Sequence, residues 1–145
     1  MIRAFDPSDA DDLIRVWLAA TIPGQSFLPE EHWRSMESVI REALIPIADT
    51  WVLEVDGELV AFLSLLGDLI GGLFTHPVHQ GKGHGRALVE HALDLHDPVF
   101  VEVFEANESA VRFYRRRGFV DHDRRVDPPS GLPLRILRLE KAVTR

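Results

Sequence analysis

The chain has 145 residues, of which 46% are hydrophobic and 27% are charged. At about 100–200 residues per domain, this length predicts one domain spanning residues 1–145, and the composition is too apolar for a disordered chain. The sequence contains no cysteine, which excludes a disulfide scaffold, thiolate metal ligands and a cysteine nucleophile.

Two stretches of the sequence indicate whether the protein is secreted or spans a membrane. Residues 1–12 contain no apolar run, so we expect no secretory signal. Residues 59–74 are the most apolar stretch, but they are fewer than the about 20 residues that span a bilayer, and they include Asp68. We therefore expect a cytoplasmic protein without a membrane partner.

The formal net charge is −7, from 16 basic and 23 acidic side chains, which argues against a nucleic-acid partner. Residues 112–145 contain 10 basic and 4 acidic side chains, and residues 1–111 contain 6 and 19. Such a distribution could hold an anion near the basic end and attract a cation to the acidic part. Solvated surface charge is the alternative interpretation.

In the N-terminal half, the hydrophobic period changes from helical to strand-like. Leu13, Val16 and Trp17 lie at helical spacing, and Asp56-Gly57 is typical of a hairpin turn. We expect a strand at residues 2–5, a helix ending at a break over residues 21–29, a helix at residues 30–44, and strands at residues 51–55 and 58–66.

The C-terminal half alternates strands and helices. Gly71-Gly72 within a strand indicates a bulge or a close backbone approach, and Gly118 is placed as a helix stop. We expect strands at residues 69–75 and 99–104, helices at residues 86–95 and 107–117, and strands at residues 119–120 and 134–139. The order β-α-α-β-β-β-α-β-α-β-β predicts a mixed α/β domain.

A glycine-rich loop, Gln80-Gly81-Lys82-Gly83-His84-Gly85-Arg86, precedes one predicted helix. Free N–H groups at a helix start attract an anion, and glycine lets the backbone approach a phosphate closely. Lys82 and Arg86 would supply charge. The glycine spacing is neither a Walker A nor a dinucleotide fingerprint, and a purely structural turn is the alternative.

Two motifs in order carry a resemblance to a known family. One is Leu73-Phe74-Thr75-His76-Pro77 leading into Gln80-x-x-Gly83-x-Gly85, and the other is Asn107-x-x-Ala110-x-x-Phe113-Tyr114-x-x-x-Gly118-Phe119. Over residues 69–120, these motifs and the element order resemble the GNAT superfamily of acyl-CoA-dependent N-acyltransferases. The resemblance implies the GNAT fold, N-acetyltransferase activity and acetyl-CoA as co-substrate.

The resemblance also implies site residues. The pantetheine arm would meet backbone groups of Leu73, Phe74 and Thr75 and the side chain of Asn107. The pyrophosphate would meet the loop, comprising Gly81, Lys82, Gly83, His84, Gly85 and Arg86. Tyr114 matches the tyrosine that protonates the departing thiolate, and a phenol with a pKa near 10 can donate to a thiolate whose acid has a pKa of about 8–9.

The base that takes the proton of the amine stays open. Glu102 lies in mid-strand beside the expected cleft, and some members of the resembled family carry a catalytic glutamate at this position. It could act directly or through a water, and a carboxylate on a solvated strand face is the alternative. Asp68, Glu54 and His76 are weaker candidates.

Aromatic residues near the expected helix break could form the acceptor pocket or belong to the core; they are Trp17, Phe27 and Trp33, with His32 beside them. For residues 115–117, all arginine, a cap of the helix C-terminus is favoured over contact with the cofactor phosphates. His76, His79 and His84 are close in sequence, but with no H-E-x-x-H motif and no cysteine we expect no metal site.

We expect direct transfer of an acetyl group to an amine, because no cysteine is available to carry an acyl group. The acceptor stays open between a small molecule, such as a polyamine, aminoglycoside or amine metabolite, and a protein lysine or N-terminus. The acidic residues 1–111 favour a cationic acceptor. A homodimer is a candidate assembly. A non-catalytic CoA-binding regulator is one alternative, opposed by Tyr114. A nucleotide-binding protein is another, opposed by the missing Walker residues.

Overall fold

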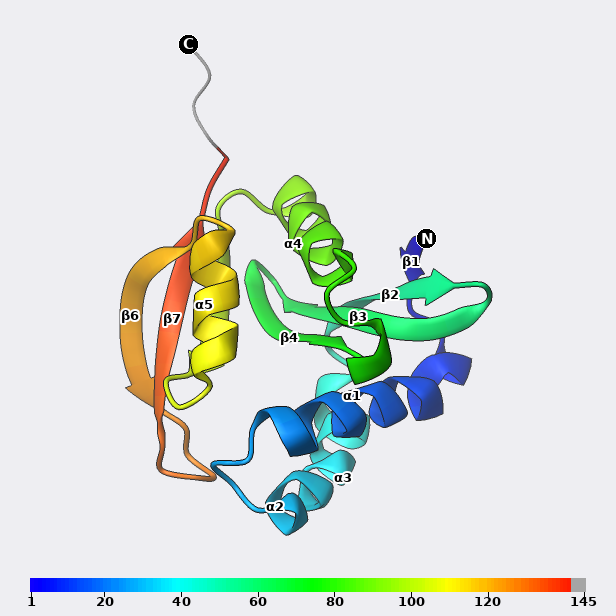
Figure 1. Cartoon of the computed structure of the whole chain (residues 1–145), viewed down its shortest axis with the longest axis horizontal. Coiled ribbons are helices and arrows are strands. Elements are labelled where there is room, and N and C mark those ends of the chain that lie inside the picture. The colour runs from blue at the N-terminus through cyan, green and yellow to red at the C-terminus, as the bar shows by residue number, and fades with distance from the viewer. Residues whose placement is uncertain (142–145) are drawn as a thin grey trace.

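The computed structural model describes residues 1–141, and its strands form one seven-stranded sheet with the order β1-β2-β3-β4-β5-β7-β6 (Figure 1). Strands β4 and β5 are parallel, and the other neighbouring pairs are antiparallel. The strands are β1 Ile2–Ala4, β2 Asp49–Val55, β3 Glu58–Leu66, β4 Leu69–Thr75, β5 Val99–Phe104, β6 Val120–Val126 and β7 Pro133–Leu139. The predicted mixed α/β fold is confirmed.

Helices cover both faces of the sheet. They are α1 Ala10–Gly24, α2 Glu30–Ser35, α3 Glu37–Val39, α4 His84–Leu95 and α5 Glu108–Arg116. One apolar cluster joins α4 and α5 to the sheet and includes Tyr114, and a second joins α1 and α2 through Trp17 and Trp33. The adjacent β3 residues Phe62 and Leu63 belong to different clusters, because successive side chains of a strand point to opposite faces.

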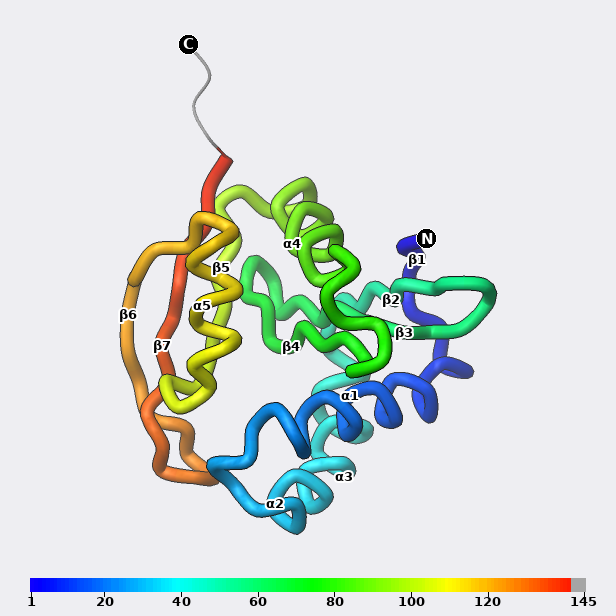
Figure 2. The backbone as a smooth tube through the Cα atoms, viewed as in Figure 1, coloured from blue at the N-terminus to red at the C-terminus, as the bar shows by residue number. Residues whose placement is uncertain are grey.

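The sheet opens between β4 and β5. These strands pair only at Leu69–Phe100 and Ile70–Val101 and then separate. The next β4 residue, Gly71, has no partner on β3 and forms the bulge that the sequence predicts. Figure 2 shows the chain on either side of this opening, with β1–β4 and α1 on one side and β5–β7 and α5 on the other. The separated strand edges leave backbone groups available to a ligand.

Helix α1 continues through the start of the break that we expected at residues 21–29, so this boundary was wrong. Pro23 lies in its last turn, where its missing N–H removes only one backbone hydrogen bond. The N–H of Gln25 still donates to the carbonyl of Thr21 at 2.8 Å. The helix therefore ends at Gly24, about one turn beyond the start of the break that we expected.

The helix expected at residues 30–44 is divided. It consists of α2, α3 and a π-helical turn over Ile40–Leu44, in which the N–H of Ile45 donates to the carbonyl of Ile40 at 2.9 Å. A π-turn is wider than an α-turn and is frequent at functional sites. This turn contributes apolar side chains to the cavity described below.

Strand β6 is longer than the two-residue strand expected at residues 119–120. It runs from Val120 to Val126, and all its residues are exposed. The sequence Val-Asp-His-Asp-Arg-Arg-Val has no alternation that would predict a half-buried strand. Pairing with β7 forms it as the edge of the sheet.

Candidate active site

Two cavities lie on either side of the separated strands and meet at three residues. One has a volume of about 240 Å³ and is bounded by β3, β4, β5, α1 and α2. The other has a volume of about 470 Å³ and is bounded by the glycine-rich loop, the end of β4 and α5. Leu73, Ala110 and Tyr114 line both. We call them the acceptor cavity and the loop cavity.

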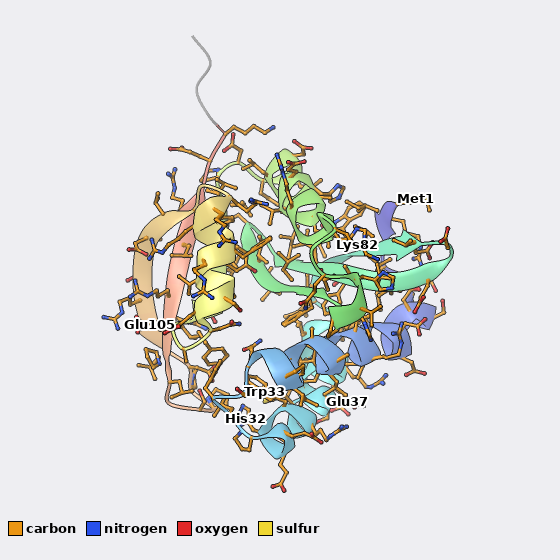
Figure 3. The ribbon with its side chains drawn as sticks, in the orientation of Figure 1. Met1, His32, Trp33, Glu37, Lys82 and Glu105 are labelled. Carbon is orange, nitrogen blue, oxygen red and sulfur yellow. The ribbon has the colours of Figure 1, made fainter. Side chains whose placement is uncertain are left out.

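Most residues predicted to bind the cofactor line the loop cavity. They are Leu73, Thr75, Gly81, Gly83, His84, Gly85 and Arg86. Phe74 and Asn107 line the acceptor cavity instead, next to the junction. Lys82 is not among the residues that line either cavity; it is exposed, and Figure 3 places it just before α4.

The backbone of the loop has the form that an anion site requires. Gly81 and Gly83 have φ angles of +78° and +84°, in the left-handed region that favours glycine, and Gly83 is the N-cap of α4. The side chain of Gln80 donates to the carbonyl of Thr75 at 3.0 Å and so ties the loop to the end of β4. The first N–H groups of α4 are therefore available to a phosphate.

Arginine side chains, rather than His84, supply positive charge to the loop cavity at neutral pH. Burial, with the nearby His79 and Lys82, lowers the pKa of His84 below its ordinary value. Arg86 and Arg117 line the cavity, and the guanidinium of Arg117 lies 5.5 Å above the Phe113 ring. From sequence we favoured a helix cap for Arg117 over contact with the phosphates, because a helix C-terminus explains arginine equally well.

The acceptor cavity has mainly apolar walls. Trp17 and Trp33 line it, and the indole N–H of Trp33 donates to the carbonyl of Gln25 at 3.0 Å. Phe27 does not line it, but its ring packs against Trp33 at 6.2 Å and against Phe104 at 5.3 Å between centroids, so it supports the wall. Figure 3 shows Trp33 and His32 side by side on α2.

Several polar side chains of the acceptor cavity were not predicted as site residues. They are Gln25, Ser64 and Asp127, whereas His32, which also lines the cavity, is named above with the aromatic residues. Asp127 follows β6 and accepts hydrogen bonds from the N–H and hydroxyl of Ser130 at 3.1 and 2.6 Å. Because β6 carries no strand signal in its sequence, nothing in the sequence alone placed Asp127 near the other residues.

Asn107 begins α5 at the cavity wall. Its side-chain oxygen accepts the N–H of Ala110 at 3.3 Å and caps the helix. The side-chain amide nitrogen has no partner among residues 1–141 and is available to a ligand.

Tyr114 occupies the junction of the cavities. Only 6% of the residue is exposed, and its ring packs against Phe113 and Phe119 with centroids 5.2 and 5.3 Å away. Its hydroxyl has no hydrogen-bond partner among residues 1–141. Burial raises the pKa of the phenol above its ordinary value of 10, so it keeps its proton at neutral pH.

The burial of the Tyr114 phenol can be measured by ultraviolet absorbance, because Tyr114 is the only tyrosine in the chain. We expect no tyrosinate absorbance near 295 nm as the folded protein is titrated through pH 10, and a folding stability that falls above that pH. The unfolded protein should titrate near pH 10 and serves as the control. A folded protein that titrates like the unfolded one would show an exposed phenol.

Glu102 lies in β5 with its side chain on the acceptor cavity and 20% exposed. Its carboxylate is ion-paired with Arg125 of β6 at 2.9 Å. The weaker base candidates Asp68, Glu54 and His76 are not among the residues that line either cavity. Of the four candidate bases, Glu102 is therefore the one that lines a cavity together with Tyr114.

Residues 1–141 contain no group of three or more histidine, aspartate or glutamate side chains arranged as metal ligands. The same part of the chain contains no helix that combines the length and apolarity needed to cross a membrane.

Comparison with known proteins identifies the family. Residues 46–121 match the acetyltransferase (GNAT) domain. The chain is 32% identical over 120 residues to the peptidyl-lysine N-acetyltransferase YiaC of Escherichia coli, covering 82% of both chains. It is also 32% identical over 139 residues to the peptidyl-lysine N-acetyltransferase YjaB of E. coli, covering 95% of this chain and 94% of YjaB. The chain belongs to the GNAT acetyltransferase family.

Solved structures agree with this assignment. The solution structure of apo-YjaB from E. coli superposes with a TM-score of 0.85 at 33% identity, covering 95% of each chain. The PaiA N-acetyltransferase of Thermoplasma acidophilum, solved in complex with coenzyme A, shares the fold with a TM-score of 0.81 at 18% identity, covering 97% of this chain and 98% of PaiA. The chain is thus an N-acetyltransferase with the GNAT fold, as its two motifs predict.

In this GNAT loop, we expect Gly85→Val to lower acetyl-CoA affinity at least tenfold. A Cβ at Gly85 would lie 3.1 Å from Cζ of Phe113, so a valine there would crowd Phe113 and alter the wall of the loop cavity that both residues line. Calorimetric titration with acetyl-CoA measures the effect. Gly24→Val is the matched control, because a Cβ at Gly24 meets nothing within 4 Å. Equal affinity in a folded Gly85→Val protein would mean that this part of the loop does not hold the cofactor.

Proposed function

We propose that the protein transfers the acetyl group of acetyl-CoA directly to the side-chain amine of a lysine in a peptide or protein. The observation that carries the proposal is that the Tyr114 side chain lines both the loop cavity and the acceptor cavity. A cofactor thiol and an acceptor amine that enter from opposite sides would meet there. The names of YiaC and YjaB support lysine as the acceptor.

The loop cavity and the separated strands fit coenzyme A. The N–H groups at the start of α4, with Arg86 and Arg117, would bind the phosphates. The free edge of β4 from Leu73 to Thr75 and the amide of Asn107 would hold the pantetheine arm. Bound there, acetyl-CoA supplies a thioester carbonyl that an amine can attack, and a backbone N–H near Phe74 or Thr75 would polarise it.

The acceptor cavity fits a lysine side chain better than a compact or anionic amine. Its aromatic walls, with Trp17 and Trp33, suit a long methylene stem, and its carboxylates, Glu102 and Asp127, suit a terminal ammonium. This pairing of an apolar wall with an acidic end matches the two parts of lysine.

The chemistry needs one proton removed and one supplied. Glu102, directly or through a water, would take a proton from the ammonium, because only the neutral amine can attack. Tyr114 would donate its proton to the departing sulfur. Holding both reactants in one cleft supplies much of the acceleration.

The test is thiol release from acetyl-CoA with a lysine peptide, followed by the mass of the peptide. A thiol reagent reads only released CoA, because the protein has no cysteine. We expect an increase of one acetyl group on lysine, with less activity on spermidine or on a free peptide N-terminus. Acetyl-CoA binding without thiol release from any amine would favour a non-catalytic CoA-binding regulator.

The domain organisation, the compartment and the partners of the protein are also part of the proposal. We propose that residues 1–145 form a single N-acetyltransferase domain acting in the cytoplasm, with amines as its partners rather than nucleic acid or membrane. The formal net charge of −7 supports a cationic acceptor.

A further inference from the structure

The side chain of Glu102 lies between the acceptor cavity and Arg125 of β6. From β5 its carboxylate lines the acceptor cavity, and from outside the cavity Arg125 holds both of its oxygens. Nε of Arg125 lies 2.9 Å from Oε2, and Nη2 lies 3.0 Å from Oε1. This two-point contact satisfies the carboxylate as an incoming ammonium would, and it neutralises the charge.

The pairing register of β5, β7 and β6 explains how Arg125 contacts Glu102. Strand β7 lies between β5 and β6, and its Leu134 pairs with both Phe104 and Arg125. Phe104 and Glu102 are two residues apart and share one face of β5, so Arg125 reaches Glu102 diagonally across β7. The preceding residue, Arg124, pairs instead with Glu105 at 2.6 Å.

We propose that Arg125 is a specificity-determining residue of the acceptor site, which occupies Glu102 until a cationic amine competes for it. The inference rests on the proposed function, because it takes the lysine ammonium as the competing cation. A neutral or anionic ligand has no charge to exchange with the guanidinium. Arg125 thereby lowers the affinity of the acceptor site for a cationic amine and leaves the affinity for a neutral ligand unchanged.

The contact is weak enough to be exchanged. The Arg125 side chain is 55% exposed and extends from an edge strand whose residues are all exposed. An exposed ion pair of this kind changes an equilibrium constant by at most about fivefold. Asp127, the other carboxylate of the cavity, is bonded to the neutral groups of Ser130 and does not depend on an arginine in this way.

The experiment is calorimetric titration of two peptides in the presence of CoA, which prevents turnover. One peptide contains a single lysine, and the other has norleucine, which lacks the charge, at that position. We expect Arg125→Gln to bind the lysine peptide about two- to fivefold more tightly and the norleucine peptide unchanged. Arg125→Lys should stay near the wild-type affinity, because it keeps the competing charge.

Arg124→Gln is the matched control, since it removes the neighbouring arginine and its pair with Glu105. The inference is overturned if Arg124→Gln and Arg125→Gln change the affinity for the lysine peptide equally, or if Arg125→Gln binds this peptide more weakly than the wild type. Either result leaves the proposed function standing. A wild-type protein that neither binds nor acetylates the lysine peptide overturns both. Thermal unfolding of each variant confirms that the affinities refer to folded protein.

Discussion

Tyr114→Phe should lower kcat about a hundredfold while the affinity for acetyl-CoA stays nearly unchanged. General acid catalysis contributes about 10²–10⁴-fold, and a thiolate is a modest leaving group, so the low end is expected. The substitution keeps the ring that packs against Phe113 and Phe119 and removes only the hydroxyl at the junction of the cavities. A loss in kcat without a loss in binding is the signature of an interaction made in the transition state.

Steady-state kinetics, acetyl-CoA titration and thermal unfolding on one preparation decide the role of Tyr114. If the hydroxyl only stabilised the core, the variant would lose about 0.5–1.5 kcal/mol of stability and keep its turnover. That outcome would remove the acid from the mechanism and favour the non-catalytic alternative.

Glu102→Gln should lower the rate at neutral pH by about a hundredfold and recover part of it at high pH. The substitution keeps the shape of the side chain and removes the base, whose contribution falls in the same range as that of the acid. At high pH the free amine forms without help, so the variant and the wild type should converge. The pH–rate profile with a lysine peptide measures this.

Glu105→Gln is the matched control for Glu102. Both carboxylates are 20% exposed and both are paired with an arginine of β6, but Glu105 is not among the residues that line the acceptor cavity. Figure 3 shows Glu105 near the lower end of α5. A profile of Glu102→Gln that matches the wild type would leave Glu102 with a structural role, and the base would then be sought in a water chain.

The loop side of the site could be predicted because its geometry restricts residue type. Gly83 needs a positive φ, and Gly85 needs the space that Phe113 fills. Such requirements produce glycines at fixed spacing, which are visible in the sequence. The expected reason for Gly85 was approach of a phosphate, and the structure adds a second one, since a Cβ at this position would crowd the Phe113 ring at 3.1 Å.

The acceptor side could be predicted only in part, because its residues are brought together by the pairing of distant strands. The aromatic residues Trp17 and Trp33 lie at spacings that fit a helix core as well as a pocket. Arg125 and Asp127 lie in or beside an exposed edge strand without alternation, so their approach to the cavity depends on the register with β7. Local sequence carries no information on that register.

The most direct test of the account is the initial-velocity pattern with acetyl-CoA and a lysine peptide varied together. Direct transfer in one cleft predicts intersecting lines in a double-reciprocal plot, because both reactants must be bound before the acetyl group moves. Parallel lines would contradict the account, since they indicate an acyl-enzyme that this cysteine-free chain is not expected to form.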